Sequence, residues 1–380
     1  MKKVLFATTA LVATAGVASA DVALSGSAEM GVFSESSRSI TLADDGSTLA
    51  DVTFGESEGE VAFHTHVDVN FSLSGSTDSG LTFGASVDLD EADNINGDNE
   101  DGVAVFISGD FGTLTLGDTD GAFDAAMPEL DLAAGSIFDD HTAHVGFQGN
   151  SGLDGFYDGQ ILRYDYTYMG FGIHFSVELD DSSEEYVGGI AATYSGELGA
   201  GLTLDVGLGY QMTEGSDTIL SLTAGQSVAN PIADDFRIVA EEATIHGIGA
   251  VLTSDAGFSV GVNYSHLEYD NLNIRFRQDL DPTFAGGSVT SNGSDANAGS
   301  HERTFMSIGV GYEFDAIALT ANYGTVESDG AADVFDATGY GFAAEYDLGG
   351  GLSLQLGVGH SDYDTGQAFT NYSFGASMSF

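Results

Sequence analysis

Apolar and polar side chains alternate with a period of two along most of this chain. Residues 63–74 read FHTHVDVNFSLS, so an extended chain places Phe63 and Leu73 on one side and His64 and His66 on the other. Successive side chains of a β-strand point to opposite faces, and this alternation is the pattern of a strand with one apolar face. The pattern therefore predicts an all-β protein.

Sixteen segments carry the alternation, and most are near the ~9–11 residues that a tilted strand needs to cross a bilayer. They cover residues 22–33, 63–74, 80–90, 101–109, 112–118, 160–168, 171–179, 186–195, 201–211, 243–253, 257–267, 303–313, 316–326, 337–347, 351–361 and 370–380.

The connections between these segments differ systematically in length. Seven are short, at 75–79, 110–111, 169–170, 196–200, 254–256, 314–315 and 347–351. Eight are longer, acidic and rich in Gly and Asn, the largest being 34–62, 119–159, 212–242 and 268–302, and all three prolines fall in long connections. Short turns at one end and long loops at the other are typical of outer-membrane barrels, with the turns periplasmic and the loops extracellular.

The last segment, 370–380, alternates up to Phe380, and we expect it to pair with 22–33 and close the barrel. Closure leaves no unpaired backbone group facing lipid, where each would cost several kcal/mol. Outward positions are apolar, and inward positions are Gly, Ser, Thr, Asn, Asp and Glu, so sixteen strands should enclose an aqueous channel. Tyrosines and one Phe near strand ends predict an aromatic girdle: Tyr164, Tyr168, Phe171, Tyr194, Tyr210, Tyr264, Tyr312, Tyr323, Tyr340 and Tyr346.

The first twenty residues have the pattern of a cleaved secretory signal, with Lys2 and Lys3, a short apolar run and a small-residue cleavage site. We therefore expect residues 1–20 to be a signal peptide and 21–380 to form the barrel domain. Loss of both lysines leaves six arginines against 59 acids, so the formal charge moves from −51 to −53. Such a chain cannot neutralise phosphates, which excludes nucleic-acid binding. There is no cysteine, so disulfides play no part.

Four stretches resemble the trimeric porins of alphaproteobacteria, the Rhodobacter type. They are the mature start DVALSGSAEMGVF, VNFSLSGSTDSGLTFGASVDL, VFISGDFGTLTLGDTDGAFDAA and the end YSFGASMSF. The resemblance implies a 16-stranded antiparallel barrel in the outer membrane, assembled as a homotrimer, with the third long loop folded inward. It implies passive diffusion of small hydrophilic solutes, contact with outer-membrane lipid and lipopolysaccharide, and a terminal Phe380 read by the barrel-assembly machinery.

The third long loop, 119–159, should form the constriction on this resemblance. Its acids include Asp120, Asp124, Glu129, Asp131, Asp139, Asp140, Asp154 and Asp158. The inward wall candidates that face it are Arg38, His64, His66, Arg163 and His174. Related porins set a cluster of basic wall residues against the loop acids, which implies a strong transverse field. Basic residues are scarce here, so we do not expect that field in this chain. A ring of acids selects cations, so we expect a cation-preferring pore whose preference fades in concentrated salt.

Metal binding has two candidate places. The acidic stretch 90–102 offers Asp90, Asp93, Asp98 and Asp101 as calcium ligands, although it lacks the spacing of a calcium-binding hand. His64 and His66 share a strand face but have no identified third ligand, so lumen-lining histidines are the better interpretation. No cofactor is required, and calcium would be a structural ion.

Three alternatives stay open from the sequence. A solute-specific channel of the same fold has the same pattern. A barrel lipase would use His266 or His360 with a serine such as Ser361, and we do not expect an enzyme because barrel rims commonly carry such residues. An acidic calcium-binding adhesin would need nonapeptide repeats, which are absent. The Gly-x-Gly stretches at 207–209, 247–249, 309–311 and 357–359 lie inside strands, which favours close packing or strand curvature over dinucleotide binding.

Overall fold

The structure of the chain is a computed structural model. The structure describes residues 21–44, 49–57, 59–89, 102–138, 144–145, 147, 150–157, 159–179, 185–214, 217–223, 234–240, 242–270, 273–278, 296–297, 300–330 and 336–380. The predicted signal peptide, residues 1–20, lies outside this range, as do the calcium candidates Asp90, Asp93, Asp98 and Asp101.

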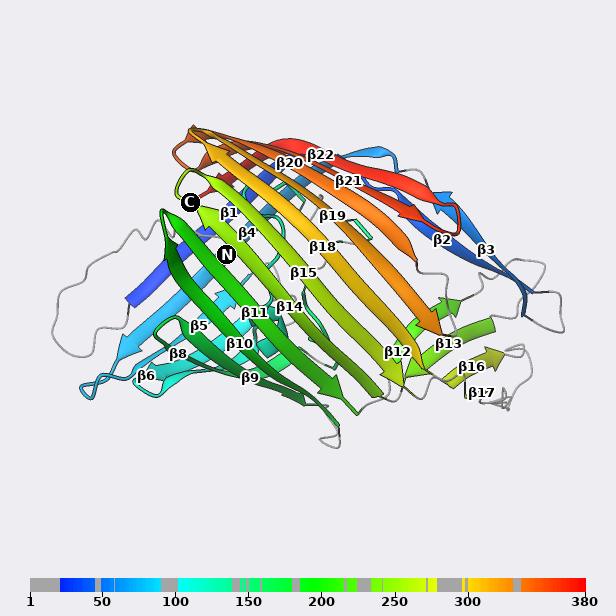
Figure 1. The fold of residues 1–380 in the computed structure, drawn as a ribbon, viewed down its shortest axis with the longest axis horizontal. Coiled ribbons are helices and arrows are strands. Elements are labelled where there is room, and N and C mark those ends of the chain that lie inside the picture. The colour runs from blue at the N-terminus through cyan, green and yellow to red at the C-terminus, as the bar shows by residue number, and fades with distance from the viewer. Residues whose placement is uncertain are drawn as a thin grey trace.

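Sixteen antiparallel strands form one closed barrel, in the order β1-β22-β21-β20-β19-β18-β15-β14-β11-β10-β9-β8-β7-β6-β5-β4 (Figure 1). Their bounds are β1 Asp21–Ser34, β4 Val61–Ser76, β5 Thr82–Asp88, β6 Val103–Gly109, β7 Gly112–Asp118, β8 Gln160–Tyr168, β9 Phe171–Leu179, β10 Tyr186–Gly199, β11 Leu202–Thr213, β14 Glu242–Ser254, β15 Phe258–Asp270, β18 His301–Phe314, β19 Ile317–Gly330, β20 Ala337–Gly349, β21 Leu352–Tyr363 and β22 Ala368–Ser379. Each predicted segment coincides with one of these strands, so the fold prediction is confirmed.

The barrel closes where the sequence predicts. Strand β22 pairs with β1 in a register that runs from Ser27↔Ser379 to Ser34↔Tyr372. The backbone N–H of Phe380 donates a hydrogen bond of 2.9 Å to the Gly26 carbonyl, so pairing continues to the last residue. No open sheet edge therefore faces the bilayer at this seam.

Tight turns connect the strands at one end of the barrel. The two-residue turn between β8 and β9 is an example, because Met169 and Gly170 both have positive φ, 50° and 84°. That conformation matches the twist of a hairpin, and a glycine adopts it without steric cost. Short turns of this kind fix the register of each hairpin.

The other end of the barrel carries additional strands within the long loops (Figure 1). Strands β2 Ser37–Asp44 and β3 Leu49–Ser57 form a hairpin between β1 and β4. A separate four-stranded sheet consists of β12 Asp217–Thr223, β13 Asp234–Ala240, β16 Asn273–Gln278 and β17 Ala296–Asn297. The sequence predicts these stretches only as loops, because none belongs to the continuous alternation of the barrel strands.

The two faces of the barrel wall follow the alternation, with one correction. Outward apolar side chains are exposed to the bilayer, and Phe63 is 90% exposed. The inward face is not uniformly polar as predicted, because Val187, Ile245 and Leu267 point into the barrel and are buried there. The loop between β7 and β8 covers them. No helix in the described part of the chain is long and apolar enough to cross a membrane.

Candidate functional site: the constriction loop

The connection between β7 and β8, residues 119–159, begins with the short helix α1, Ala122–Ala126. Asp124 lies in its first turn, where a carboxylate is favoured by the helix dipole. The helix ends before Pro128, because Met127 adopts an extended conformation, as residues preceding proline prefer. At its start, Gly121 N donates to Asp154 Oδ2 at 2.6 Å, which joins the two ends of the connection.

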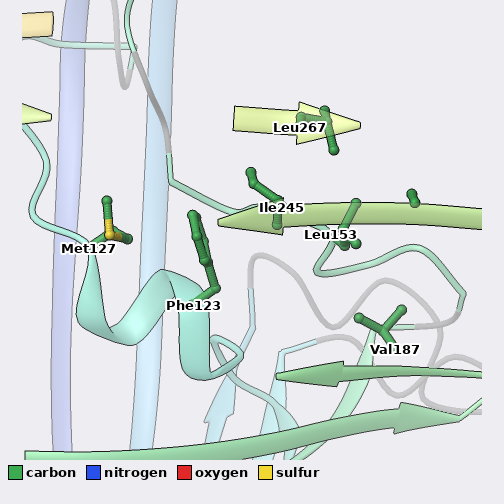
Figure 2. Close-up of a cluster of buried hydrophobic side chains, with 7 residues drawn as sticks. Phe123, Met127, Leu153, Val187, Ile245 and Leu267 are labelled. Atoms are coloured by element: carbon green, nitrogen blue, oxygen red, sulfur yellow. The ribbon is translucent and has the colours of Figure 1, made fainter. Parts of the chain in front are cut away.

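One face of α1 packs on the inner surface of the barrel wall. Phe123 and Met127 form a buried apolar cluster with Leu153 of the same connection and with wall side chains of β10, β14 and β15 (Figure 2). The wall members are Val187, Ala243, Ile245 and Leu267. Burial of this apolar surface fixes the start of the connection inside the barrel.

From α1 the chain follows the inner wall, and each stage is marked by a hydrogen bond from its backbone. Ala122 N donates to Ser176 Oγ on β9 at 2.9 Å. Ala134 N donates to Thr320 Oγ1 on β19 at 2.8 Å, and Ala133 N donates to the same oxygen at 2.9 Å. The first half of the path along the inner wall ends at β1, where Phe138 N donates to the Glu29 carboxylate at 2.9 Å.

The chain then returns along the same side. Val145 N donates to Ser361 Oγ on β21 at 3.1 Å. Leu153 N donates to Gln211 Oε1 on β11 at 2.7 Å, and Gly159 N donates to Glu178 Oε1 on β9 at 2.8 Å. The connection 119–159 is therefore an inward-folded loop, and we call it the constriction loop.

The constriction loop divides the inner wall into two regions. The covered wall is the inward face from β9 through β22 to β1, against which the described part of the loop is anchored. The uncovered wall is the inward face of β5–β8 with residues 66–74 of β4. Because the loop occupies the space in front of the covered wall, the passage through the barrel lies between the loop and the uncovered wall.

Arg163 of β8 is the predicted basic residue that lies closest to the constriction loop. Its Nη1 donates to the Asp120 backbone carbonyl at 2.6 Å and lies 3.8 Å from the Asp120 carboxylate. Its Nε donates to Asp165 Oδ2 at 3.0 Å. His174 is joined to the same group, with Nδ1 2.7 Å from Asp165 Oδ1 and Nε2 3.1 Å from Thr193 Oγ1. The Arg163 charge is thus paired with nearby acids.

The acids of the loop occupy different environments. Asp120 is 66% exposed to the passage. Burial raises the pKa of Asp124 to about 7, with further contributions from Asp120, Asp154 and Glu129. Burial also raises the pKa of Asp154 to about 6, against the lowering effect of its hydrogen bonds to Gly121 and Gln211. Asp131 and Glu129 are partly exposed, and Asp139, Asp140 and Asp158 lie outside the described residues.

Two of the predicted wall histidines, His64 and His66, lie at the tip of the loop. His64 is only 9% exposed, because Phe138 packs on it with a ring-centroid distance of 5.1 Å. Its Nε2 lies 3.0 Å from Glu29 Oε2, and its ring stacks on that of His66 at 6.3 Å. Arg38 lies in β2, and its side chain is outside the described part. In the described regions, no three or more His, Asp or Glu side chains are arranged to hold a metal ion.

Several residues that hold the loop were missed by the sequence analysis. Glu178 is the clearest case, because it is 2% exposed and accepts hydrogen bonds from Tyr157 N and Gly159 N. Gln211 and Thr320 have comparable roles on β11 and β19. The available signal was an inward position that carries a large polar side chain, but alternation alone does not say which inward positions meet the loop.

A closed sixteen-stranded barrel with an inward loop and an apolar exterior defines an outer-membrane channel protein. The family model described as Gram-negative porin matches residues 7–366, and the chain belongs to this family. A porin of Rhodobacter capsulatus is 28% identical over 305 residues, covering 79% of this chain and 88% of that protein. This protein is thus a porin of the outer membrane.

Solved structures of porins have the same fold. One porin structure, refined at 1.8 Å, is 25% identical, matches with a TM-score of 0.62, and covers 94% of this chain and 100% of that chain. An anion-selective porin from Comamonas acidovorans matches with a TM-score of 0.54 at 13% identity, covering 95% of this chain and 100% of that one, a likeness of fold alone.

Membership of this family makes the protein a channel rather than an enzyme. The geometry also argues against the lipase alternative. His360 lies on the outward face of β21, where its Nδ1 is 2.8 Å from Thr370 Oγ1. Ser361 points inward and accepts from Val145 N, so the two side chains lie on opposite faces of the wall.

Proposed function

We propose that this porin is a general diffusion channel for small hydrophilic solutes with a preference for cations. The observation that carries the proposal is the charge balance around the passage. The uncovered wall contributes the acids Asp68, Asp88 and Asp165, and the facing loop contributes Asp120. Arg163, the described arginine of the uncovered wall, is paired with Asp165 and Asp120, so the passage keeps a negative potential.

The sign of selectivity has to be argued from side chains. The Comamonas acidovorans porin is anion-selective, and it has the same fold as this chain. Fold therefore does not decide which ions pass. Here 59 acids stand against eight basic residues in the whole sequence, and the paired state of Arg163 extends that excess into the constriction.

The proposal includes the partners that the resemblance implies. We propose a homotrimer in contact with outer-membrane lipid and lipopolysaccharide, and Phe380 as part of the signal for the barrel-assembly machinery. The position of Phe380 supports this role, because the residue continues the β22 pairing and its side chain is 71% exposed. Removal of Phe380 should lower the amount of folded protein in outer membranes, and unchanged amounts would argue against the role.

Calcium as a structural ion is the remaining part of the proposal. It rests on the density of carboxylates in residues 90–102, which repel one another unless a cation intervenes. The measurement is the melting temperature of the purified protein with calcium and after chelation. A fall on chelation that calcium reverses supports a structural ion, and equal melting temperatures would discard it.

The test of the channel proposal is single-channel recording of the purified protein in a planar bilayer under a tenfold KCl gradient. We expect three equal closing steps and a reversal potential on the cation side. A reversal potential on the anion side would overturn the cation preference. Conductance that saturates with one solute, and is blocked by it, would replace the general channel with a solute-specific one.

A further inference from the structure

A row of glycines runs along the covered wall beneath the constriction loop. The inward faces of the covered strands carry glycine where the loop passes over them, and four Gly-x-Gly stretches supply most of the row. We call these residues the glycine track: Gly189, Gly207, Gly209, Gly247, Gly249, Gly261, Gly309, Gly311, Gly339, Gly357, Gly375 and Gly31.

At several positions of this track the loop lies too close for any other residue type. A Cβ added at Gly309 would lie 2.8 Å from the Leu130 carbonyl oxygen and 2.9 Å from Leu130 Cβ. One added at Gly357 would lie 2.6 Å from Ser136 Cβ. At Gly207 the added atom would overlap the carbonyl oxygen of Ala126. These neighbours are backbone or Cβ atoms, so the loop itself would have to move.

For the other barrel glycines whose neighbours are described, the nearest atoms do not belong to the loop. On the uncovered wall, a Cβ at Gly84 would meet Leu73 and Phe106, which belong to the neighbouring strands. Outward Gly188 of β10 would meet the flexible ring of Tyr186 at 3.1 Å. Close approach of the constriction loop is therefore a property of the track.

Glycine has a cost in a strand, because it weakens the strand and offers no side chain for packing. In the track that cost recurs on strand after strand of the covered wall, at inward positions that the loop crosses. The track removes a layer of side chains between wall and loop, so the loop lies flat on the backbone of the wall. The loop then occupies as little of the lumen as its own thickness allows.

We propose that the glycine track sets the width of the channel by fixing how far the constriction loop stands from the covered wall. The track glycines are positioning residues, since none lines the passage itself. A side chain on the track can displace the loop in one direction only, toward the uncovered wall, because the wall behind it is continuous. Added volume on the track should therefore narrow the passage without changing any charged group.

The experiment compares G207A/G309A with two controls that each carry one Gly→Ala change, G188A on the outward face and G135A on the loop. The added Cβ of G135A meets only Gln355 Nε2, at 3.7 Å. For G207A/G309A we expect a roughly 1.5-fold lower single-channel conductance and a lower size limit for uncharged sugars. Both quantities depend on the diameter of the passage. The controls should conduct like the wild type.

The reversal potential separates this inference from the proposed cation preference, because it should be unchanged in every variant. Unchanged or increased conductance in G207A/G309A would overturn the track proposal and leave the selectivity proposal intact. A second pair of variants, G261A and G261A/L130A, distinguishes displacement of the loop from misfolding. In G261A the new Cβ lies 2.6 Å from Leu130 Cδ2, an atom that L130A removes. Recovery of conductance in G261A/L130A relative to G261A supports the track, and failure to recover argues against it.

Discussion

The covered and uncovered walls have the same strand geometry and the same alternation, yet the main residue types on their inward faces differ. The covered wall carries glycines, buried apolar residues such as Ile245, and isolated anchors such as Thr320. The uncovered wall carries charged and hydroxyl side chains, among them Arg163 and Asp165. One region is the packing surface for a loop, and the other is the lining of a passage.

This difference shows how a barrel divides two tasks between its sides. A packing surface needs shape, and close approach is achieved by removing side chains and by burying a few apolar ones. A passage needs polar and charged groups that replace part of the hydration of a solute. Period-two alternation meets both needs, because inward residues can change along the circumference while the outward face remains apolar.

Removal of the passage charges should have the largest effect. In D120N/D124N/E129Q/D131N we expect the cation-to-anion permeability ratio to fall by about threefold to tenfold at low salt, since four loop carboxylates are removed. Screening should shrink the difference at 1 M salt, where the Debye length is ~3 Å. Reversal potentials under KCl gradients measure both effects.

A control variant removes the same number of carboxylates, four, from the outer surface. In E268Q/E302Q/E327Q/D329N the substituted carboxylates belong to outward positions of β15, β18 and β19, in neighbouring pairs Glu268↔Glu302↔Asp329. Its ion preference should equal that of the wild type. An equal loss of preference in both variants would show that total charge, rather than the passage, sets selectivity.

Arg163 offers a smaller test from the uncovered side. R163Q removes one positive charge from the passage together with its contacts to Asp165 and Asp120, so the preference for cations should rise by less than about twofold. R163K keeps the charge but loses the forked donor geometry, and it should stay near the wild type. A decrease of cation preference in R163Q would contradict the assigned position of this side chain.

The sequence predicted the barrel in full because every strand repeats one physical constraint, an apolar face toward lipid. It predicted the loop between Asp118 and Gln160 by its length, and its inward fold only through the resemblance. It did not predict that His64 would be buried by Phe138, or that Glu178 would hold the end of the loop. Those contacts depend on where the loop crosses each strand, which alternation does not encode.

Acidity should change the preference through Asp124. Burial raises its pKa to about 7, with Asp120, Asp154 and Glu129 adding to the rise and Arg163 opposing it. The carboxyl is therefore neutral at pH 5 and charged at pH 8.5, so cation preference should increase between these values. In D124N part of this pH dependence should disappear, as measured by reversal potentials. Identical pH profiles in both proteins would show that Asp124 does not act on passing ions.

His144 gives the smallest effect, and it sharpens the comparison from the covered side. Burial lowers the pKa of this loop side chain to about 4, and its Nε2 lies 3.0 Å from Asn322 Oδ1 on β19. The folded state therefore disfavours the protonated form, whereas the unfolded chain takes up the proton near the ordinary value of 6.5. The stability that this site contributes is fully present at neutral pH and is lost as the pH falls from 6.5 toward 4.

Glutamine at this position can donate to Asn322 but does not titrate. H144Q should therefore lose less stability than the wild type between pH 7 and 4.5, a difference of roughly 1–2 °C in melting temperature for a chain of this size. Melting curves of both proteins at the two pH values measure it. Because His144 lies on the covered side, its protonation should leave the reversal potential at pH 5 equal in H144Q and the wild type. A shift of that potential would place His144 in the passage and erase the division between the two walls.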